Sequence, residues 1–229
     1  MNQNENYSCE TCTIKSCAVE TLGFSELQIL ERNFGVRHFK KNETIFQQGS
    51  LTSNIAYIKH GLVKIHKKGP VKDQILKLIK PLCFIGIPTI LGDRLYQYSA
   101  TAIENTSVCF IDTDVFRKLI LENGKFGNEI IKELCQDELL FFERSINQMQ
   151  KQIHGRLADA LLFLANDIFQ SEVFIMPLSR SELGDFIHST RESVTRCLTS
   201  FKKDGLIEIN GKQFTLLDKA ALIRVSKTG

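Results

Sequence analysis

The sequence of 229 residues predicts an α+β protein with three parts in chain order: a β-rich roll, one long helix, and a small domain of helices followed by a hairpin. Short β-branched or aromatic segments alternate with turn residues over 21–122. Apolar side chains then recur at alternating spacings of four and three residues within 123–154. Two helical patterns and a hairpin signal occupy 155–229, so the chain holds two modest domains and a connecting helix.

Composition places the chain among ordinary globular proteins and limits its partners. Hydrophobic residues make up 43% and the net charge is +3, so affinity for nucleic acid would have to come from a local patch and from pairing of subunits. Residues 1–8 are polar, and no apolar run approaches the length that a bilayer requires. We therefore expect a cytoplasmic protein with no membrane partner, whose seven cysteines form no structural disulfides.

Residues 1–20 form an N-terminal arm with three closely spaced cysteines in the run CETCTIKSC. These are Cys9, Cys12 and Cys17. Three thiolates this close repel one another unless a cation or a cluster neutralises them, so the run indicates a metal site that needs one more ligand. Cys135 and Cys197 lie on apolar helical stripes and are interpreted as packed core residues. The remaining candidates for the fourth ligand are Cys83 and Cys109.

Residues 21–122 have the texture of a β-barrel or jelly roll. The segments 39–46, 55–58 and 62–65 are rich in β-branched and aromatic residues and are separated by turn signals. Three glycines are interpreted as turn residues, and none of them alone implies a phosphate-binding loop: Gly49, Gly61 and Gly86.

The long helix is expected over 123–154 and carries one apolar seam with heptad spacing. The members of the seam are Cys135, Leu139, Phe142, Ile146, Met149 and Ile153. A stripe of this length must be covered, either by the β-rich domain of the same chain or by the same helix of a second copy. Gly155 would mark the hinge to the C-terminal domain, whose core would begin with an apolar helix at 157–169.

The C-terminal domain opens its functional part with Ser179 and Glu182, a capping-box pattern that predicts the start of a short helix. The residues that this helix should bury are Leu183, Phe186 and Ile187. A turn at 188–190 follows, and a second helix begins at Thr190 with the apolar stripe Val194, Cys197, Leu198 and Phe201. Two apolar strand segments then flank Asn210-Gly211, a two-residue hairpin signal, which completes a winged helix-turn-helix.

The second helix of this pair has a polar face that no core demands. Long hydrogen-bonding side chains at its N-terminal end are typical of the helix that enters the major groove of DNA, where Arg binds guanine and Glu accepts from cytosine. The alternative is an amphipathic helix pair whose charges are merely solvated. The coincidence of capping box, turn, polar face and hairpin favours DNA binding, and an operator with two half-sites favours a homodimer through the seam. The expected DNA contacts are Arg180, Ser189, Thr190, Arg191, Glu192, Thr195 and Arg196.

The run RSELGDFIHSTRESVTRCL resembles the helix-turn-helix of the Crp/Fnr family of bacterial transcription regulators, and the match extends through the wing. KNETIFQQGS followed by IAYIKHGLVKI is similar to the effector domain of that family, a β-roll shared with cyclic-nucleotide-binding domains. The resemblance implies double-stranded DNA with a two-fold operator, a homodimer and RNA polymerase as partners. Glu192 and Arg196 are shared by Crp-like and Fnr-like readers, which implies a GA core in each half-site. His188 stands where the family usually has a turn glycine, and His tolerates a positive φ better than most residues.

CETCTIKSC also resembles the N-terminal cysteine motif of the oxygen-sensing Fnr branch, and ENTSVCFID resembles the segment that carries the internal cluster ligand of that branch. By position, this resemblance implies a [4Fe-4S] cluster with oxygen or nitric oxide as the trigger. Its ligands would be Cys9, Cys12, Cys17 and Cys109. Four residues separate Cys12 from Cys17, whereas the best-known Fnr proteins have five. A structural zinc site, a thiol switch and the absence of a cofactor are the alternatives, since four thiolates suit both metals.

Cyclic AMP is not expected as the effector. A phosphate pocket in this fold needs a glutamate just after the glycine of Phe84-Ile85-Gly86 and an Arg-Ser pair further on. The chain has Ile87 and Pro88 at the first place and Tyr98-Ser99 at the second. Burying a phosphate without a cation is costly, which excludes cyclic AMP but not another small ligand in the roll.

Other functional classes fit less of the sequence. An iron-sulfur electron carrier would explain the cysteines but would leave the polar helix face and the wing without a purpose. The five histidines show no metal-ligand or nucleophile-base spacing, so an enzyme is not expected.

Overall fold

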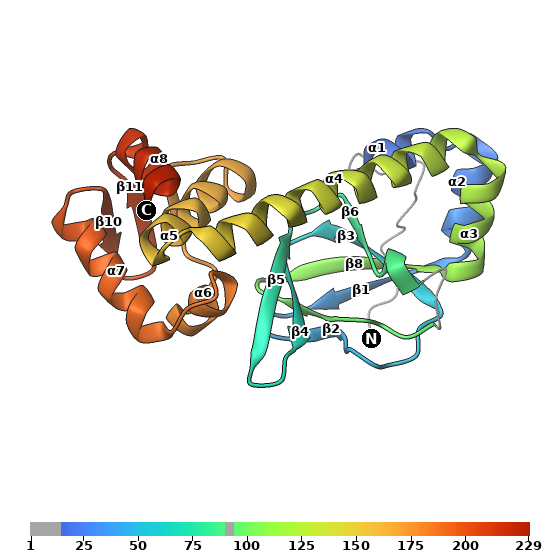
Figure 1. The fold of residues 1–229 in the computed structure, drawn as a ribbon. Helices are drawn as coiled ribbons and strands as arrows, with labels where there is room; N and C mark the ends of the chain where they lie inside the picture. Colours follow the sequence, from blue (N-terminus) through green and yellow to red (C-terminus); the bar gives the residue numbers. More distant parts are fainter. Residues whose placement is uncertain (1–14, 90–93) are drawn as a thin grey trace. The chain divides into compact units, whose positions relative to one another are not determined.

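A computed structural model of the chain describes residues 15–89 and 94–229 (Figure 1). They divide into two compact units. The first comprises the described residues up to Lys68 together with Lys77–Glu138, and the second comprises Gly69–Leu76 together with Leu139–Gly229. Across these described stretches, no helix is both long enough and apolar enough to cross a membrane.

The first unit is built on a β-roll of two antiparallel four-stranded sheets with the strand orders β1-β8-β3-β6 and β2-β7-β4-β5 (Figure 1). The strands of the first sheet are β1 (Phe34–Phe39), β3 (Asn54–His60), β6 (Cys83–Ile85) and β8 (Thr106–Asp112). Those of the second are β2 (Thr44–Phe46), β4 (Val63–Lys68), β5 (Asp73–Ile79) and β7 (Ser99–Ala102). Gly49, Gly61 and Gly86 all have positive φ, which confirms their interpretation as turn glycines.

An apolar cluster joins the first sheet to the helices of this unit: α1 (Cys17–Glu20), α2 (Phe24–Arg32), α3 (Thr113–Glu122) and the start of α4 (Gly124–Gln150). Its centre is a group of aromatic rings in which Phe116 and Phe126 pack edge to face at 5.4 Å and Phe84 meets Phe116 at 5.0 Å. Phe116 and Phe126 are fully buried. Such pairs contribute beyond their buried area, so this cluster fixes α3 and the start of α4 on the roll.

A second apolar cluster fills the interior of the roll. Phe46 stacks on Tyr96 with ring centroids 3.8 Å apart, and the hydroxyl of Tyr98 accepts a hydrogen bond of 2.8 Å from the backbone N–H of Gly86. Burial raises the pKa of Tyr98 to about 12, so it stays a neutral phenol at physiological pH. Of the two places at which a nucleotide phosphate would need an acid and a cation, the first thus carries Ile87 and Pro88 and the second carries Tyr98.

The helix predicted over 123–154 is interrupted, which corrects that prediction. Helix α4 ends at Gln150, and a separate helix, α5 (Ile153–Phe163), begins after the extended residue Gln152. Ile153 therefore lies on a different helix from the rest of the seam. Gly155 is not a hinge but a buried position inside α5, where a Cβ would come within 2.4 Å of the carbonyl oxygen of Gly229.

The apolar seam of α4 is exposed in the single chain. Leu139 is 62% exposed, Phe142 52% and Met149 74%, and Cys135 is exposed as well. Cys135 is therefore not a core residue of the chain, contrary to its interpretation as one. Among the residues that the structure describes, none covers these four side chains of α4.

The winged domain follows α5 with a π-helical turn (Leu164–Ile168), three strands and three helices (Figure 1). They are β9 (Val173–Ile175), α6 (Arg180–Phe186), α7 (Arg191–Lys203), β10 (Ile207–Asn210), β11 (Gln213–Leu216) and α8 (Lys219–Thr228). The sheet order is β10-β11-β9. Asn210 pairs with Gln213, so the hairpin turn is Gly211-Lys212 and not the predicted Asn210-Gly211. Gly211 has φ +60, which suits the first position of a two-residue hairpin turn.

Candidate nucleic-acid interface

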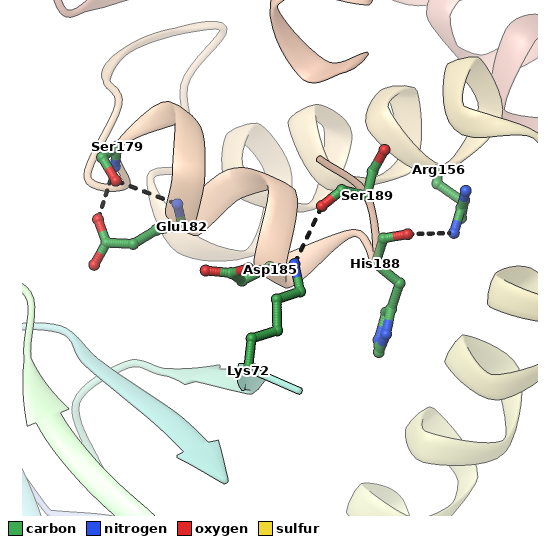
Figure 2. Close-up of polar contacts among 7 residues, drawn as sticks. All are labelled: Lys72, Arg156, Ser179, Glu182, Asp185, His188 and Ser189. Carbon is green, nitrogen blue, oxygen red and sulfur yellow. Dashed lines mark hydrogen bonds and ion pairs between the residues drawn. The ribbon is translucent and has the colours of Figure 1, made fainter. Parts of the chain in front are cut away.

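Helix α6 begins at the predicted capping box. The backbone N–H of Glu182 donates to the Ser179 hydroxyl at 3.2 Å, and the Glu182 carboxylate accepts from the backbone N–H of Ser179 at 2.9 Å (Figure 2). Two backbone donors that a helix start leaves unpaired are thereby satisfied. Leu183 and Ile187 are buried as predicted, whereas Phe186 is only half-buried.

The turn between the helices is tight and has an unusual backbone conformation. His188 has φ +54, a left-handed conformation that residues other than glycine rarely adopt. Its carbonyl oxygen accepts a hydrogen bond of 3.0 Å from Nη1 of Arg156 in α5 (Figure 2). Gly184 permits the close approach of the turn, since a Cβ there would lie 3.0 Å from the carbonyl oxygen of Ser189. The turn therefore fixes the direction in which α7 leaves it.

Helix α7, called the reading helix below, begins after Thr190, whose hydroxyl accepts from the backbone N–H of Ser193 at 3.2 Å. Its buried residues are the four predicted ones, Val194, Cys197, Leu198 and Phe201. Burial raises the pKa of Cys197 to about 12, so this thiol is inert and serves packing.

The opposite face of the reading helix carries exposed polar side chains at its N-terminal end: Arg191, Glu192, Thr195 and Arg196. The pKa of Glu192 is lowered by hydrogen bonds from its own backbone N–H and from Thr190, and further by Arg191 and Arg196. The group is therefore a stable carboxylate acceptor between cations. Acceptor and donor side chains of this reach match base edges in the major groove.

Two of the expected contact residues are held by neighbours within the helix. Arg196 Nη2 donates to the hydroxyl of Ser193 at 3.3 Å, and the Thr195 hydroxyl donates to the carbonyl of Arg191 at 2.8 Å. Ser193, which sequence reasoning passed over, thus orients Arg196. The i,i+3 spacing of these two residues on a helix was the signal that could have revealed it.

Arg180 lies apart from the exposed row of the reading helix. Its guanidinium stands 5.0 Å from the ring centroid of Phe214 in β11, and burial lowers its pKa. The stacking links the start of α6 to the wing. Ser189 is half-buried and Thr190 exposed, so both flank the start of the reading helix together with Arg191.

Of the four cysteines expected to bind a cluster, Cys9 and Cys12 lie outside the described residues. Cys17 is exposed at the start of α1, and Cys109 is half-buried in β8, opposite Val36 of β1 and Tyr57 of β3. Cys109 packs against the same apolar cluster as Ala18 and Val19, the residues that follow Cys17. Cys109 and the residues that follow Cys17 therefore pack against the same apolar cluster. The described part of the chain contains no group of three side chains that could hold a metal ion.

Both parts of the chain match known family models. Residues 36–123 match the cyclic nucleotide-binding domain, and residues 155–225 match the Crp-like helix-turn-helix domain. The matches cover the β-roll and the winged domain in the order in which the chain presents them.

Similar proteins span nearly the whole chain. The transcriptional activator protein FnrA of Stutzerimonas stutzeri is 25% identical over 93% of this chain and 90% of its own length. The anaerobic regulatory protein of Pasteurella multocida is 26% identical over 96% of this chain and 83% of its own length. The solved structure of FixK2 from Bradyrhizobium japonicum superposes with a TM-score of 0.76 at 19% identity, covering 84% of this chain and 96% of that one, which shows a shared fold.

Proposed function

The chain belongs to the Crp/Fnr family of transcription regulators, and from that premise we propose that it is a homodimeric reader of a two-fold operator controlled by an iron-sulfur cluster. As a member of this family it is a DNA-binding transcription regulator and not an enzyme. The observation that carries the proposal is the exposed polar end of the reading helix, set on a capped and tightly packed helix pair beside a wing.

We assign base recognition to the N-terminal end of the reading helix. Arg196, which donates to Ser193, is assigned to a guanine, and the carboxylate of Glu192 is assigned to a cytosine amine. The resemblance of these two residues to those of Crp-like and Fnr-like readers supports a GA core in each half-site. Arg191 and Thr195 extend the same face, while Arg180, Ser189 and Thr190 border the DNA backbone. A helix N-terminus adds favourable interaction with phosphate.

Dimerisation through α4 supplies the two-fold symmetry. The seam residues Leu139, Phe142, Ile146 and Met149 are exposed in the single chain, as are Leu134 and Phe141 beside them. An apolar surface of this extent on a monomer indicates a partner, and the same helix of a second copy has the matching heptad spacing. The distance between two half-sites is then set by the dimer.

The cysteines are proposed to hold a [4Fe-4S] cluster. The donor set fits, because the N-terminal run provides three thiols and Cys109 in β8 borders the apolar cluster on which α1 packs. One relative of this chain is named anaerobic regulatory protein, which supports oxygen as the signal, and nitric oxide is the alternative signal that the Fnr resemblance implies. A bound cluster would supply an oxygen-labile centre that neutralises the thiolates.

The residues of the chain connect that site to α4. Phe84 and Phe116 of the same apolar cluster pack against each other and against Phe126 near the start of α4. We propose that cluster binding is transmitted to α4 through this aromatic group, which packs the start of α4 against β6 and α3. RNA polymerase is the further partner proposed, and cyclic AMP is not the effector, because Tyr98 and its neighbours provide neither the carboxylate nor the cation for it.

The test is a visible spectrum of protein purified without oxygen, followed by a mobility shift with a palindromic duplex before and after admission of air. We expect brown, iron-containing protein that binds the duplex and loses affinity in air. Cys12→Ala should lose both the colour and regulated binding. Colourless, iron-poor protein with equal affinity in air would refute control by a cluster, and brown protein that ignores every duplex would favour an electron carrier.

A further inference from the structure

The turn between β4 and β5 and the first residues of β5, together Gly69–Leu76, group with the C-terminal unit. Nζ of Lys72 lies 2.6 Å from Oδ1 of Asp185 in α6 and 3.3 Å from the carbonyl oxygen of Ser189 (Figure 2). The turn is tight and is closed by a 3.1 Å hydrogen bond from the N–H of Gly69 to the carbonyl of Lys72. Lys72 therefore projects from a shaped turn and donates to the helix-turn-helix at two points.

The turn that Lys72 contacts is also held from the other side. Arg156 donates to the carbonyl of His188, and Lys72 donates to the carbonyl of Ser189, so two consecutive turn carbonyls accept from cations on different elements (Figure 2). His188 has φ +54, a conformation that persists only where the surroundings stabilise it. The hydrogen bonds from Arg156 and Lys72 to the turn carbonyls stabilise this conformation.

The base of the same hairpin segment is anchored independently by Arg144 of α4. Nη1 of Arg144 donates to the carbonyl of Leu76 at 3.4 Å, and its guanidinium lies 4.9 Å from the ring centroid of Phe163 and 5.7 Å from that of Phe186. Leu76, Phe163 and Phe186 also line one cavity of about 220 Å³ within this unit. The hairpin segment thus contacts the helix-turn-helix directly through Lys72 and is linked to Phe186 of α6 through Arg144 of α4.

We propose that Lys72 is a positioning residue for operator recognition, which acts by clamping the turn between α6 and the reading helix through Asp185 and the Ser189 carbonyl. The direction of the reading helix depends on the turn that precedes it. A clamped turn presents Arg196 and Glu192 to the groove without an added ordering cost on binding. The inference rests on the proposed reading role of α7 and adds to it a residue from the β4–β5 hairpin.

The expected effect is modest, because the Lys72 and Asp185 side chains are 49% and 23% exposed. Partly exposed ion pairs are weak, and here one carbonyl hydrogen bond is lost as well, so Lys72→Met should lower operator affinity about threefold to tenfold. Asp185→Asn should lower it by a similar or smaller factor. The double variant should add little, because both changes break one clamp.

The experiment measures affinity of the full-length, oxygen-free protein for the palindromic duplex that the unaltered chain selects from a randomised pool, at several salt concentrations. Lys72→Arg should keep most of the affinity. Lys67→Met, which removes an exposed lysine of β4, is the matched control for loss of one charge from this hairpin. If Lys72 acts by positioning, its loss leaves the salt dependence of binding nearly unchanged, whereas loss of a phosphate contact reduces the slope by about one.

Tighter binding by Lys72→Met would overturn the proposal and make the clamp inhibitory. Tighter binding by Asp185→Asn together with a reduced salt slope in Lys72→Met would make Lys72 a direct phosphate contact, and affinities equal to that of the unaltered chain would remove any role. Hydrogen exchange tests the clamp without DNA. The N–H of Ser189, bonded at 2.8 Å to the carbonyl of Gly184, should exchange faster in Lys72→Met. If the unaltered chain binds no duplex, the proposed function fails, while the exchange result still decides the clamp.

Discussion

Helices α4 and α7 are both amphipathic, yet they expose opposite kinds of surface. The reading helix covers its apolar stripe within its own domain and leaves Arg191, Glu192 and Arg196 in solvent. Helix α4 leaves its apolar seam in solvent, with Leu139 62% exposed. What a helix exposes indicates its partner: a polar end suits base edges and phosphates, whereas an apolar seam suits a second copy of itself.

A substitution in the buried stripe of the reading helix should lower the stability of its domain. Leu198 is 2% exposed, and Leu198→Ala should lower the free energy of unfolding of the winged domain by about 2–5 kcal/mol, because a cavity replaces packed methyl groups. Chemical denaturation followed by helix signal measures it. Thr199→Ala, an exposed neighbour on the same helix, should change stability by less than about 0.5 kcal/mol. Equal stabilities for the two variants would contradict the assignment of faces.

On α4, a polar substitution in the exposed seam should weaken assembly of the dimer. Leu139→Asp places a charge on the exposed seam, so it should leave the fold of the chain intact, abolish the dimer and lower operator affinity about a hundredfold through loss of bivalent binding. Sedimentation and mobility shift measure the two effects. Gln136→Asp, at an exposed position off the seam, is the control, and a Leu139→Asp dimer would refute the seam as the interface.

Substitutions at the polar end of the reading helix should have a smaller effect on operator binding. Arg196→Ala should cost about 1–3 kcal/mol of binding at one base pair and relax specificity there, with no loss of stability. Ser193→Ala should cost less, because it removes only the 3.3 Å contact that orients Arg196. Binding to duplexes varied at single positions measures both. A uniform loss of affinity over all sequences would make Arg196 a phosphate contact instead.

Sequence reasoning succeeded where structure depends on near neighbours. The capping box of Ser179 and Glu182, the buried stripe of the reading helix and the turn glycines all follow from interactions over three or four residues or from one backbone angle. These signals are physical constraints of single helices and turns. The family resemblance added that the β-rich segment is a roll of the kind shared with cyclic-nucleotide-binding domains.

What sequence reasoning missed depends on distant contacts. Gly155 is required by the packing of Gly229 against α5, and the hairpin turn is shifted by one residue by the pairing of Asn210 with Gln213. The seam spacing continued smoothly through the break at Lys151-Gln152, so periodicity alone could not place the end of α4. Lys72 and Asp185 lie 113 residues apart, and no local pattern marks an exposed lysine as a clamp.

The smallest expected effect concerns the turn that joins α6 to the reading helix. His188 has a pKa below its usual 6.5 because of burial, with Arg156 and Lys72 adding repulsion against a positive ring. The unfolded chain takes up a proton near pH 6.5, while the folded chain does so only at lower pH. In that interval the unfolded state holds more protons, so stability falls as the pH decreases from about 6.5 towards the folded pKa.

His188→Asn isolates this effect, because Asn adopts the left-handed conformation readily and does not titrate. Unfolding free energies of the two proteins, measured from pH 8 to pH 5, should diverge below about pH 6.5, with the unaltered chain losing the more stability. The loss is small, because His188 is only partly buried and solvent screens the repulsion from Arg156 and Lys72. In the Lys72→Met background the divergence should shrink, since one of the two cations is gone. Parallel curves for the unaltered chain and His188→Asn would mean that the ring is hydrated and that the turn is not sensitive to its charge.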